Sequence, residues 1–200
     1  SMEGPMTKLK TAVVLTTALS AAALFAGDVQ LDKSHTKVEF NVTHLTISDV
    51  TGRFDEFEGK GSFDEKTGVL SALDVKIKVK SINTNDEKRD DHLRSADFFD
   101  ASKYSEITFV LTKPVTLVKG GTANLQGNLT MRGVTKPITL QMNYKGTVKD
   151  PWGNVKAGFI LTGKVNRKDF GVSWSKNMDN GGAVVGDIVT INIAGEAAVK

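Results

Sequence analysis

The sequence of 200 residues contains no cysteine. This absence excludes disulfide bonds, thiolate metal sites and cysteine nucleophiles, so burial alone must stabilise the folded core. A strong charge of either sign is also missing, because the formal net charge is only +3. Such a balanced chain gives no reason to expect a nucleic acid as a partner, and at most a transient contact with a membrane.

Motifs that carry catalysis are absent as well. The sequence has no G-x-S-x-G motif, no phosphate-binding loop and no dinucleotide-binding fingerprint. Its three histidines, His35, His44 and His92, lie far apart and have neither HxH nor HExxH spacing. We therefore expect no cofactor, no metal and no catalytic residue.

The longest apolar run lies near the start of the chain. We interpret residues 1–5 (SMEGP) as a cloning remnant and residues 6–26 as a secretory signal peptide, because two lysines precede an apolar stretch that ends in small residues. Cleavage after Ala23 and cleavage after Ala26 both fit, and an N-terminal membrane anchor is the alternative. We expect an exported, periplasmic protein whose single domain occupies residues 27–200.

Most of the remaining chain alternates apolar and polar side chains. The series Thr36, Val38, Phe40 and Val42 on even positions is an example, and this period of two predicts half-buried β-strands. Eight or nine such runs are joined mostly by short turns, a pattern typical of a closed barrel or a sandwich. We expect an all-β fold that is an eight-stranded antiparallel β-barrel, because long strands with free edges would invite aggregation.

Glycines recur in the series predicted to face the barrel interior, at Gly59, Gly61, Gly127 and Gly163. A packed core would place side chains at such positions, so we interpret these glycines as leaving space inside the barrel. An eight-stranded barrel is just wide enough to hold one small ligand. The sequence thus favours an apolar cavity, and a core filled by side chains is the alternative.

The alternation is interrupted between Asp86 and Phe109, where charged residues come first and aromatic residues follow. Thr84 and Glu87 have the spacing of a capping box, which predicts a helix of about ten residues that begins at Asn85 or Asp86. This helical insert, around residues 85–95, has almost no apolar stripe. We expect it to cap one end of the barrel.

Two kinds of contact are predicted to hold this cap. Asp90 and Arg94 are spaced to form an ion pair along the helix. Phe98, Phe99 and Tyr104 follow the helix and are predicted to fasten it to the barrel.

Several stretches together resemble one protein family. They are HTKVEFNVTHL, RDDHLRSADFFDASKYSEITF, GNLTMRGVTKPITL, DPWGNVKAGF and RKDFGVSW. From about Leu31 to Val199 the chain resembles the YceI-like family of polyisoprenoid-binding proteins. One departure is Ser105, which stands where the family usually has proline.

The resemblance implies an extended lipocalin-like barrel that is periplasmic or secreted and has no catalytic activity. It implies that the barrel carries a long isoprenoid, such as a polyprenyl chain or an isoprenoid quinone, and it is compatible with a homodimer. Some relatives hold fatty-acid-like molecules, so a fatty-acid or fatty-amide carrier of the same fold is the alternative.

We predict that the barrel interior binds and transports or stores this lipid. The residues predicted to line the tunnel are Val38, Phe40, Val42, Phe54, Val75, Ile77, Val79, Phe109, Leu125, Leu129, Met142, Phe159 and Leu161. Those predicted to shape its ends are Phe98, Phe99, Phe170 and Trp174. His44, Arg89 and Asp90 are predicted to contact a polar head group.

Two other classes of function remain as hypotheses. One is a periplasmic enzyme that uses the charged side chains of the helix from Asp86 to Arg94. The other is a module that binds another periplasmic protein through exposed aromatic residues such as Trp152.

Overall fold

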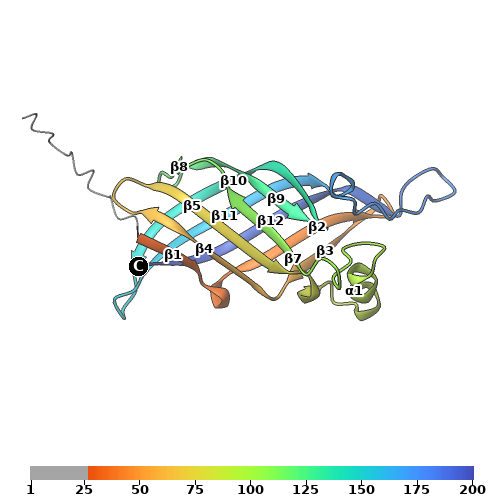
Figure 1. The fold of residues 1–200 in the computed structure, drawn as a ribbon, viewed down its shortest axis with the longest axis horizontal. Helices are drawn as coiled ribbons and strands as arrows, with labels where there is room; N and C mark the ends of the chain where they lie inside the picture. Colours follow the sequence, from red (N-terminus) through yellow and green to blue (C-terminus); the bar gives the residue numbers. More distant parts are fainter. Residues whose placement is uncertain (1–26) are drawn as a thin grey trace, which may run out of the picture.

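The protein is described here by a computed structural model of residues 27–200, which form one elongated antiparallel barrel (Figure 1). The predictions for residues 1–5 and 6–26 fall outside the described residues. Within residues 27–200, no helix has the length and apolar character needed to cross a membrane.

Twelve strands and one α-helix make up the fold of residues 27–200. The first half of the chain contains β1 (Gly27–Leu31), β2 (Lys37–His44), β3 (Ser48–Phe54), β4 (Phe57–Asp64), β5 (Val69–Lys78), β6 (Ile82–Asn83) and α1 (Glu87–Arg94). The second half contains β7 (Glu106–Leu111), β8 (Val115–Thr116), β9 (Thr122–Met131), β10 (Val134–Lys149), β11 (Val155–Asn166) and β12 (Val185–Val199). Short 3₁₀ turns are η1 (Lys33–His35), η2 (Val79–Ser81) and η3 (Arg167–Phe170).

Pairing of these strands closes the sheet into a ring. β1 pairs with β4 and β2 pairs with β3, so β1 and β2 act as one long strand interrupted by η1. On the other side, β4 pairs with β5 and β3 pairs with the short β6, which continues the up-and-down order. β7, β9, β10, β11 and β12 follow in order, and β12 returns to pair with both β2 and β1. The predicted all-β, eight-stranded antiparallel barrel with a short helix is therefore confirmed.

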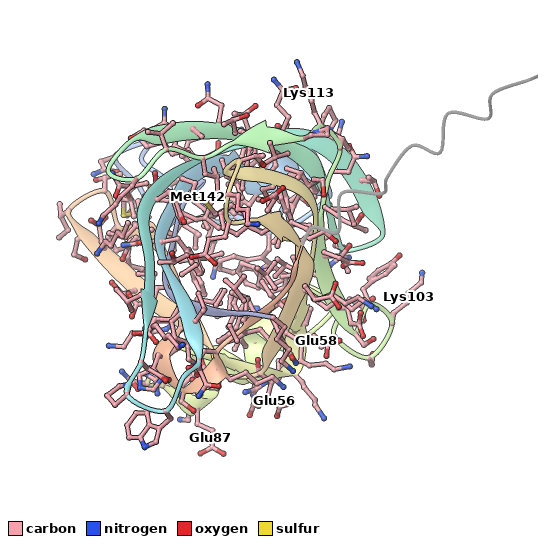
Figure 2. The ribbon with its side chains drawn as sticks, turned by 90° about the vertical axis from the view of Figure 1, so that its left-hand side faces the viewer. Glu56, Glu58, Glu87, Lys103, Lys113 and Met142 are labelled. Atoms are coloured by element: carbon pink, nitrogen blue, oxygen red, sulfur yellow. The ribbon has the colours of Figure 1, made fainter. Side chains whose placement is uncertain are left out.

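Alternation along the strands sorts side chains between the interior and the solvent. In Figure 2, which looks along the barrel, Met142 lies inside the ring of strands, whereas Glu58 and Lys113 lie outside it. The buried core is a single cluster dominated by Val, Leu, Ile and Phe. Burial of these side chains is the main stabilising contribution, as expected for a chain that lacks disulfides.

The turn between β9 and β10 is very short. β10 already begins at Val134, and Pro137 pairs with Asn128 within the sheet. The turn consists only of Arg132 and Gly133, which both have positive φ angles of 49° and 72°. This combination is the tight hairpin turn whose twist matches that of the flanking strands.

The inward glycines have a different role from the predicted one. A Cβ atom at Gly59 would collide with Leu31, one at Gly127 with the ring of Phe109, and one at Gly163 with Leu140. Each glycine therefore makes room for a large side chain from a neighbouring strand and does not itself leave the interior empty. The interpretation that these glycines create the cavity is wrong.

The helix α1 lies at one end of the barrel, and the C-terminus lies at the opposite end (Figure 1). Asp86 caps α1 by accepting a hydrogen bond from Arg89 N at 3.0 Å, so the helix begins later than the capping box of Thr84 and Glu87 predicted. Arg94 pairs with Asp91 at 3.0 Å and not with Asp90. It also donates to Lys80 O and Ile82 O, and these bonds tie the end of α1 to the barrel.

Replacing Gly127 with alanine tests whether the close approach of strands requires glycine. The new Cβ would lie 2.6 Å from Val110 O, a backbone atom that has little freedom to move. We expect Gly127→Ala to destabilise the barrel by about 1–3 kcal/mol, measured by urea unfolding.

Gly158→Ala is the matched control, because its Cβ would lie 3.4 Å from the flexible Lys145 side chain. This control should change the free energy of unfolding by less than about 0.5 kcal/mol. Equal effects of the two substitutions would contradict the steric account.

Candidate functional site

Two apolar cavities lie inside the barrel. The larger has a volume of about 1150 Å³, counted out to its openings, and lies toward α1, where Leu93, Phe98 and Phe99 form part of its wall. The smaller has about 680 Å³ and lies toward the other end, with Phe63, Leu70 and other apolar residues on its wall. Apolar walls with few polar groups are typical of small-molecule sites.

The two cavities adjoin each other. A shared set of side chains forms part of the wall of both, namely Val38, Leu73, Val75, Leu161 and Ile193. These residues come from β2, β5, β11 and β12, so they surround the interior from several sides of the barrel. The interior therefore holds two adjoining apolar compartments, which together are called the channel.

An aromatic pair lies at the end of the channel that is remote from α1. The rings of Phe63 and Tyr144 meet edge to face, with their centroids 5.7 Å apart, and both side chains lie on the wall of the smaller cavity. Burial, with a further contribution from Glu65, raises the pKa of Tyr144 above its usual value. The phenol therefore stays protonated at neutral pH, and Tyr144 is the one residue on this part of the wall whose side chain carries a polar group.

A second aromatic cluster closes the channel near α1. The ring of Phe98 lies 5.0 Å from that of His92 and 5.2 Å from that of Trp174, measured between centroids. His92 also lies 2.8 Å from Asp97 and is half-exposed. Phe98 itself is buried and lies on the cavity wall, so the cluster joins α1 and the segment before β12 to the channel.

One buried cation lies beside this apolar interior in the described part of the chain. Arg167, in η3, is only 4% exposed and forms part of the wall of the larger cavity. Its guanidinium donates to the backbone oxygens of Val172, at 2.7 Å, and Gly186, at 2.8 Å. Burial lowers the pKa of Arg167, while the charge of Asp187 opposes this shift.

Sequence reasoning missed Arg167, although a signal was present. The inward series of β11 is Ala157, Phe159, Leu161 and Val165, and the same odd parity extends to Arg167. A charged residue that continues an inward apolar series is unusual, and that irregularity marks the position. Other wall residues that were not singled out, such as Leu73 and Ile193, follow the ordinary alternation.

Most residues predicted to line the channel or shape its ends do lie on the cavity walls. They are Val38, Phe40, Val42, Phe54, Val75, Ile77, Phe98, Phe99, Phe109, Leu129, Met142, Phe159 and Leu161. They reach the interior from β2, β3, β5, β7, β9, β10, β11 and the segment after α1. Whether each of them contacts a ligand stays a prediction.

Three other predicted residues are buried but lie on neither wall. Val79 is in η2, where the strand has already ended, and Phe170 is in η3. Leu125 is fully buried in β9, packed within the solid part of the core. The prediction that Val79 and Leu125 line the channel is therefore wrong. Alternation predicts which side of the sheet a side chain faces, but it does not predict where along the interior a cavity lies.

The predicted head-group residues lie outside both cavities. His44 is at the end of β2, and Arg89 is exposed and donates to Thr84 Oγ1 and Thr84 O, both at 2.8 Å. Asp90 is buried and accepts from Thr84 N at 2.8 Å and from Thr84 Oγ1 at 2.6 Å. Arg89 and Asp90 thus hold the chain that enters α1, and we withdraw their placement beside the ligand.

One group of possible metal ligands occurs in the described part of the chain. Asp32, His35 and Glu196 place ligand atoms within 4.8 Å of one another on the outside of the barrel. Asp32 already lies 3.0 Å from both Lys156 Nζ and His35 Nδ1. Hydrogen bonds from Lys156 and from His35 lower the pKa of Asp32 to about 2, so this carboxylate already has an ammonium counter-ion and a second hydrogen-bond donor, and we assign no metal to it.

The features behind the other two hypotheses lie away from the channel. Asp86 caps α1, Asp91 pairs with Arg94, and none of the α1 carboxylates lies on a cavity wall. Trp152 is 83% exposed, in the turn between β10 and β11. The remaining large apolar side chains that are exposed in residues 27–200 are Ile47, Val110, Val118, Val148 and Ile188.

Fold and interior together define a lipocalin-like β-barrel with an apolar channel inside it. The chain belongs to the YceI-like family, since the model of the YceI-like domain matches residues 29–197. This match confirms the resemblance seen in the sequence motifs.

Individual relatives agree with this assignment. A protein of Vibrio parahaemolyticus named UPF0312 protein VPA0850 is 43% identical over 150 residues, which is 74% of this chain and 78% of the relative. The crystal structure of the YceI protein of Campylobacter jejuni is 38% identical, with a TM-score of 0.68, and the match covers 85% of this chain and 96% of that one.

A more distant structure shares the fold. It is a polyisoprenoid binding domain from Saccharophagus degradans, 18% identical, with a TM-score of 0.64 over 86% of this chain and 98% of that one.

The buried Asp90 gives a test that separates a structural role from a ligand contact. We expect Asp90→Ala to reduce the free energy of unfolding by about 1–3 kcal/mol, because the N–H and hydroxyl of Thr84 lose their shared acceptor. Chemical denaturation measures this loss.

Asp91→Ala is the control, since Asp91 is exposed and its pair with Arg94 should contribute less than about 1 kcal/mol. Below its unfolding transition, the Asp90→Ala protein should bind lipid as the original does. A selective loss of lipid affinity without a loss of stability would restore Asp90 to the binding site.

Proposed function

We propose that this protein is a non-catalytic carrier that binds a long-chain isoprenoid lipid, a polyprenyl chain or an isoprenoid quinone, inside the barrel. The observation that carries the proposal is the apolar channel formed by the two adjoining cavities. Removal of a hydrocarbon chain from water contributes about 0.8 kcal/mol per methylene group, so such a ligand needs few polar contacts. The polyisoprenoid binding domain with the same fold supports the choice of ligand.

The length of the channel favours an isoprenoid over the fatty-acid or fatty-amide alternative. Along β11 its wall extends from Ala157 to Val165, which is roughly 26 Å of strand and roughly 20 Å along an axis tilted by roughly 40°. One acyl chain spans about 15 Å, half of a bilayer's hydrocarbon core of about 30 Å. The wall continues past both residues, to Leu117 at one end and Phe98 at the other. A longer chain fills this space better.

The arrangement of charged groups favours binding over catalysis. Polar side chains on the two walls are few, namely Glu39, Tyr144 and Arg167. Asp86 caps α1, Asp90 holds the chain that enters it, and Arg94 anchors its end to the barrel. This distribution supports a carrier, in which the ligand enters and leaves unchanged.

The proposed place of action is the periplasm, where the carrier would move or store its lipid between membrane sites. Support comes from the signal-peptide pattern of residues 6–26. A transient contact with a membrane would be needed for loading, and a homodimer is compatible with the family.

Mass spectrometry of an organic extract tests the choice of ligand. We expect the full chain, exported to a bacterial periplasm and purified without detergent, to yield a long-chain isoprenoid in near-stoichiometric amount. Fatty acids or fatty amides alone in the extract would establish the alternative cargo. A protein that yields no lipid and takes up none when mixed with isoprenoids would end the carrier hypothesis.

A substitution at the junction of the two cavities tests whether the ligand spans both. Val75 lies on both walls, and we expect Val75→Phe to fill part of the junction. Affinity for a long isoprenoid should fall at least about tenfold, a loss of about 1.4 kcal/mol, while affinity for a short one such as farnesol should change much less. Binding is measured by fluorescence displacement.

The matched control is Val110→Phe, on the adjacent strand β7. Val110 is 43% exposed and pairs with Asp74, the neighbour of Val75, so the added ring would point to solvent. Thermal unfolding of both variants shows whether overpacking has damaged the barrel, which would cost about 1–3 kcal/mol. Equal losses for long and short ligands would show that the ligand does not cross the junction.

A further inference from the structure

Two aromatic side chains meet across the barrel at the end remote from α1. Phe63 belongs to β4 and Tyr144 to β10, and these strands are diametrically opposed, with β5, β7 and β9 between them on one side and β1, β12 and β11 on the other. Their rings touch edge to face, with the centroids 5.7 Å apart. A contact between opposite strands requires that the side chains reach across the interior, so the pair spans the barrel.

Neighbouring side chains fill the space beside the pair. Leu70 comes from β5 and Leu117 from the segment after β8, and both lie with the pair on the wall of the smaller cavity. These four residues are between 3% and 8% exposed, although β4 ends directly after Phe63, at Asp64. Side chains so near the end of a barrel stay buried only if they pack against one another. The channel therefore narrows to packed apolar side chains at this end.

A hydrogen bond nearer the rim joins the same two sides of the barrel. Thr147 Oγ1, on β10, donates to Glu65 Oε1, in the turn after β4, at 2.8 Å. Leu117 N donates to Gly68 O at 2.7 Å, which holds the segment after β8 against the β4–β5 turn. This end of the channel is thus built from strands and their turns, and opening it would break these bonds.

The end near α1 is built differently. Its wall includes Leu93, Phe98 and Phe99, which belong to α1 and the segment after it and not to the sheet. Hydrogen bonds from Arg94 and Arg132 fasten this insert to the barrel. Displacement of the insert would break these side-chain bonds but no strand pairing. A ligand therefore has an easier way in beside α1, and the opposite end is the one that stops it.

We propose that Phe63 and Tyr144 form the floor of the channel and set the length of isoprenoid chain that binds with full affinity. The inference rests on the proposed function and adds a selectivity for chain length and an orientation of the ligand. The tail ends against the two rings, and the polar end lies toward α1. Each isoprene unit that still enters the channel leaves water and strengthens binding, whereas units beyond its capacity stay outside and contribute little.

A series of prenyl alcohols tests the floor with the full chain. The series begins at geraniol, each member is one isoprene unit longer than the last, and fluorescence displacement measures each affinity. For the original protein we expect the affinity to rise by at least about tenfold per unit and then to stop rising at one chain length, the length limit. Phe63→Ala removes a ring of about the size of one isoprene unit, so its length limit should be one unit longer.

Phe57→Ala is the matched control. Phe57 is on the same strand, β4, and is 7% exposed, but it lies on neither cavity wall. Thermal unfolding should show that Phe57→Ala and Phe63→Ala both lose stability, since each leaves a void in the core. Only Phe63→Ala should move the length limit. Tyr144→Leu, which opens the floor from the opposite strand, should move it in the same direction.

An unchanged length limit in both Phe63→Ala and Tyr144→Leu would overturn the floor while leaving the carrier function intact. The same conclusion would follow if Phe57→Ala moved the limit equally. It would also follow if the affinity of the original protein rose without a limit, because the tail would then pass between the rings. Failure of the original protein to bind any member of the series would count against the proposed function instead.

If neither floor variant folds, a photoreactive ligand on the original protein decides the question. The longest prenyl alcohol that still gains affinity, with a diazirine at its tail end, is bound and irradiated, and mass spectrometry of peptides locates the attachment. The attachment should fall on the floor and its neighbours, namely Phe63, Leu70, Leu117 and Tyr144. Attachment to Leu93 or Phe98 would place the tail near α1 and refute the proposal.

Discussion

Closure of the sheet is the constraint on which the rest of this structure depends. β12 pairs with β2 along its first part and with β1 near its end, and these bonds leave no open edge along that side of the sheet. In a closed ring each strand forms its backbone hydrogen bonds with the strands on its two sides, so these bonds do not depend on how the interior is filled. The interior can therefore remain partly empty, whereas a sandwich of two sheets depends on contact between its inner faces.

The interior then divides into a packed part and a hollow part. Leu125 and Val79 are at most 1% exposed and lie within the packed core, while Val75 and Leu161 lie beside the channel. A void removes dispersion contacts and costs stability, as substitutions of large by small core residues show in other proteins. A hydrocarbon ligand would restore those contacts, so in the proposed function the lipid completes the core that the side chains leave unfinished.

Alternation of residues predicts the barrel well but the channel only in part. Period two assigns each residue to one side of the sheet, and this suffices for the strands and for most of the wall, such as Val38 and Phe159. It does not say how far each side chain reaches toward its neighbours across the ring. Leu125 and the glycines were misinterpreted for this reason, because packing between strands decides whether an inward position faces a void or another side chain.

The polar positions were harder to predict, because hydrogen bonding decides them more than pattern does. Asp90 lies in a run of charged residues, which predicts a solvated side chain or a head-group contact. In the structure its carboxylate is buried and accepts a hydrogen bond from the hydroxyl of Thr84. Arg167 follows an inward series on β11, and only the geometry shows that three nitrogens share four backbone acceptors unequally.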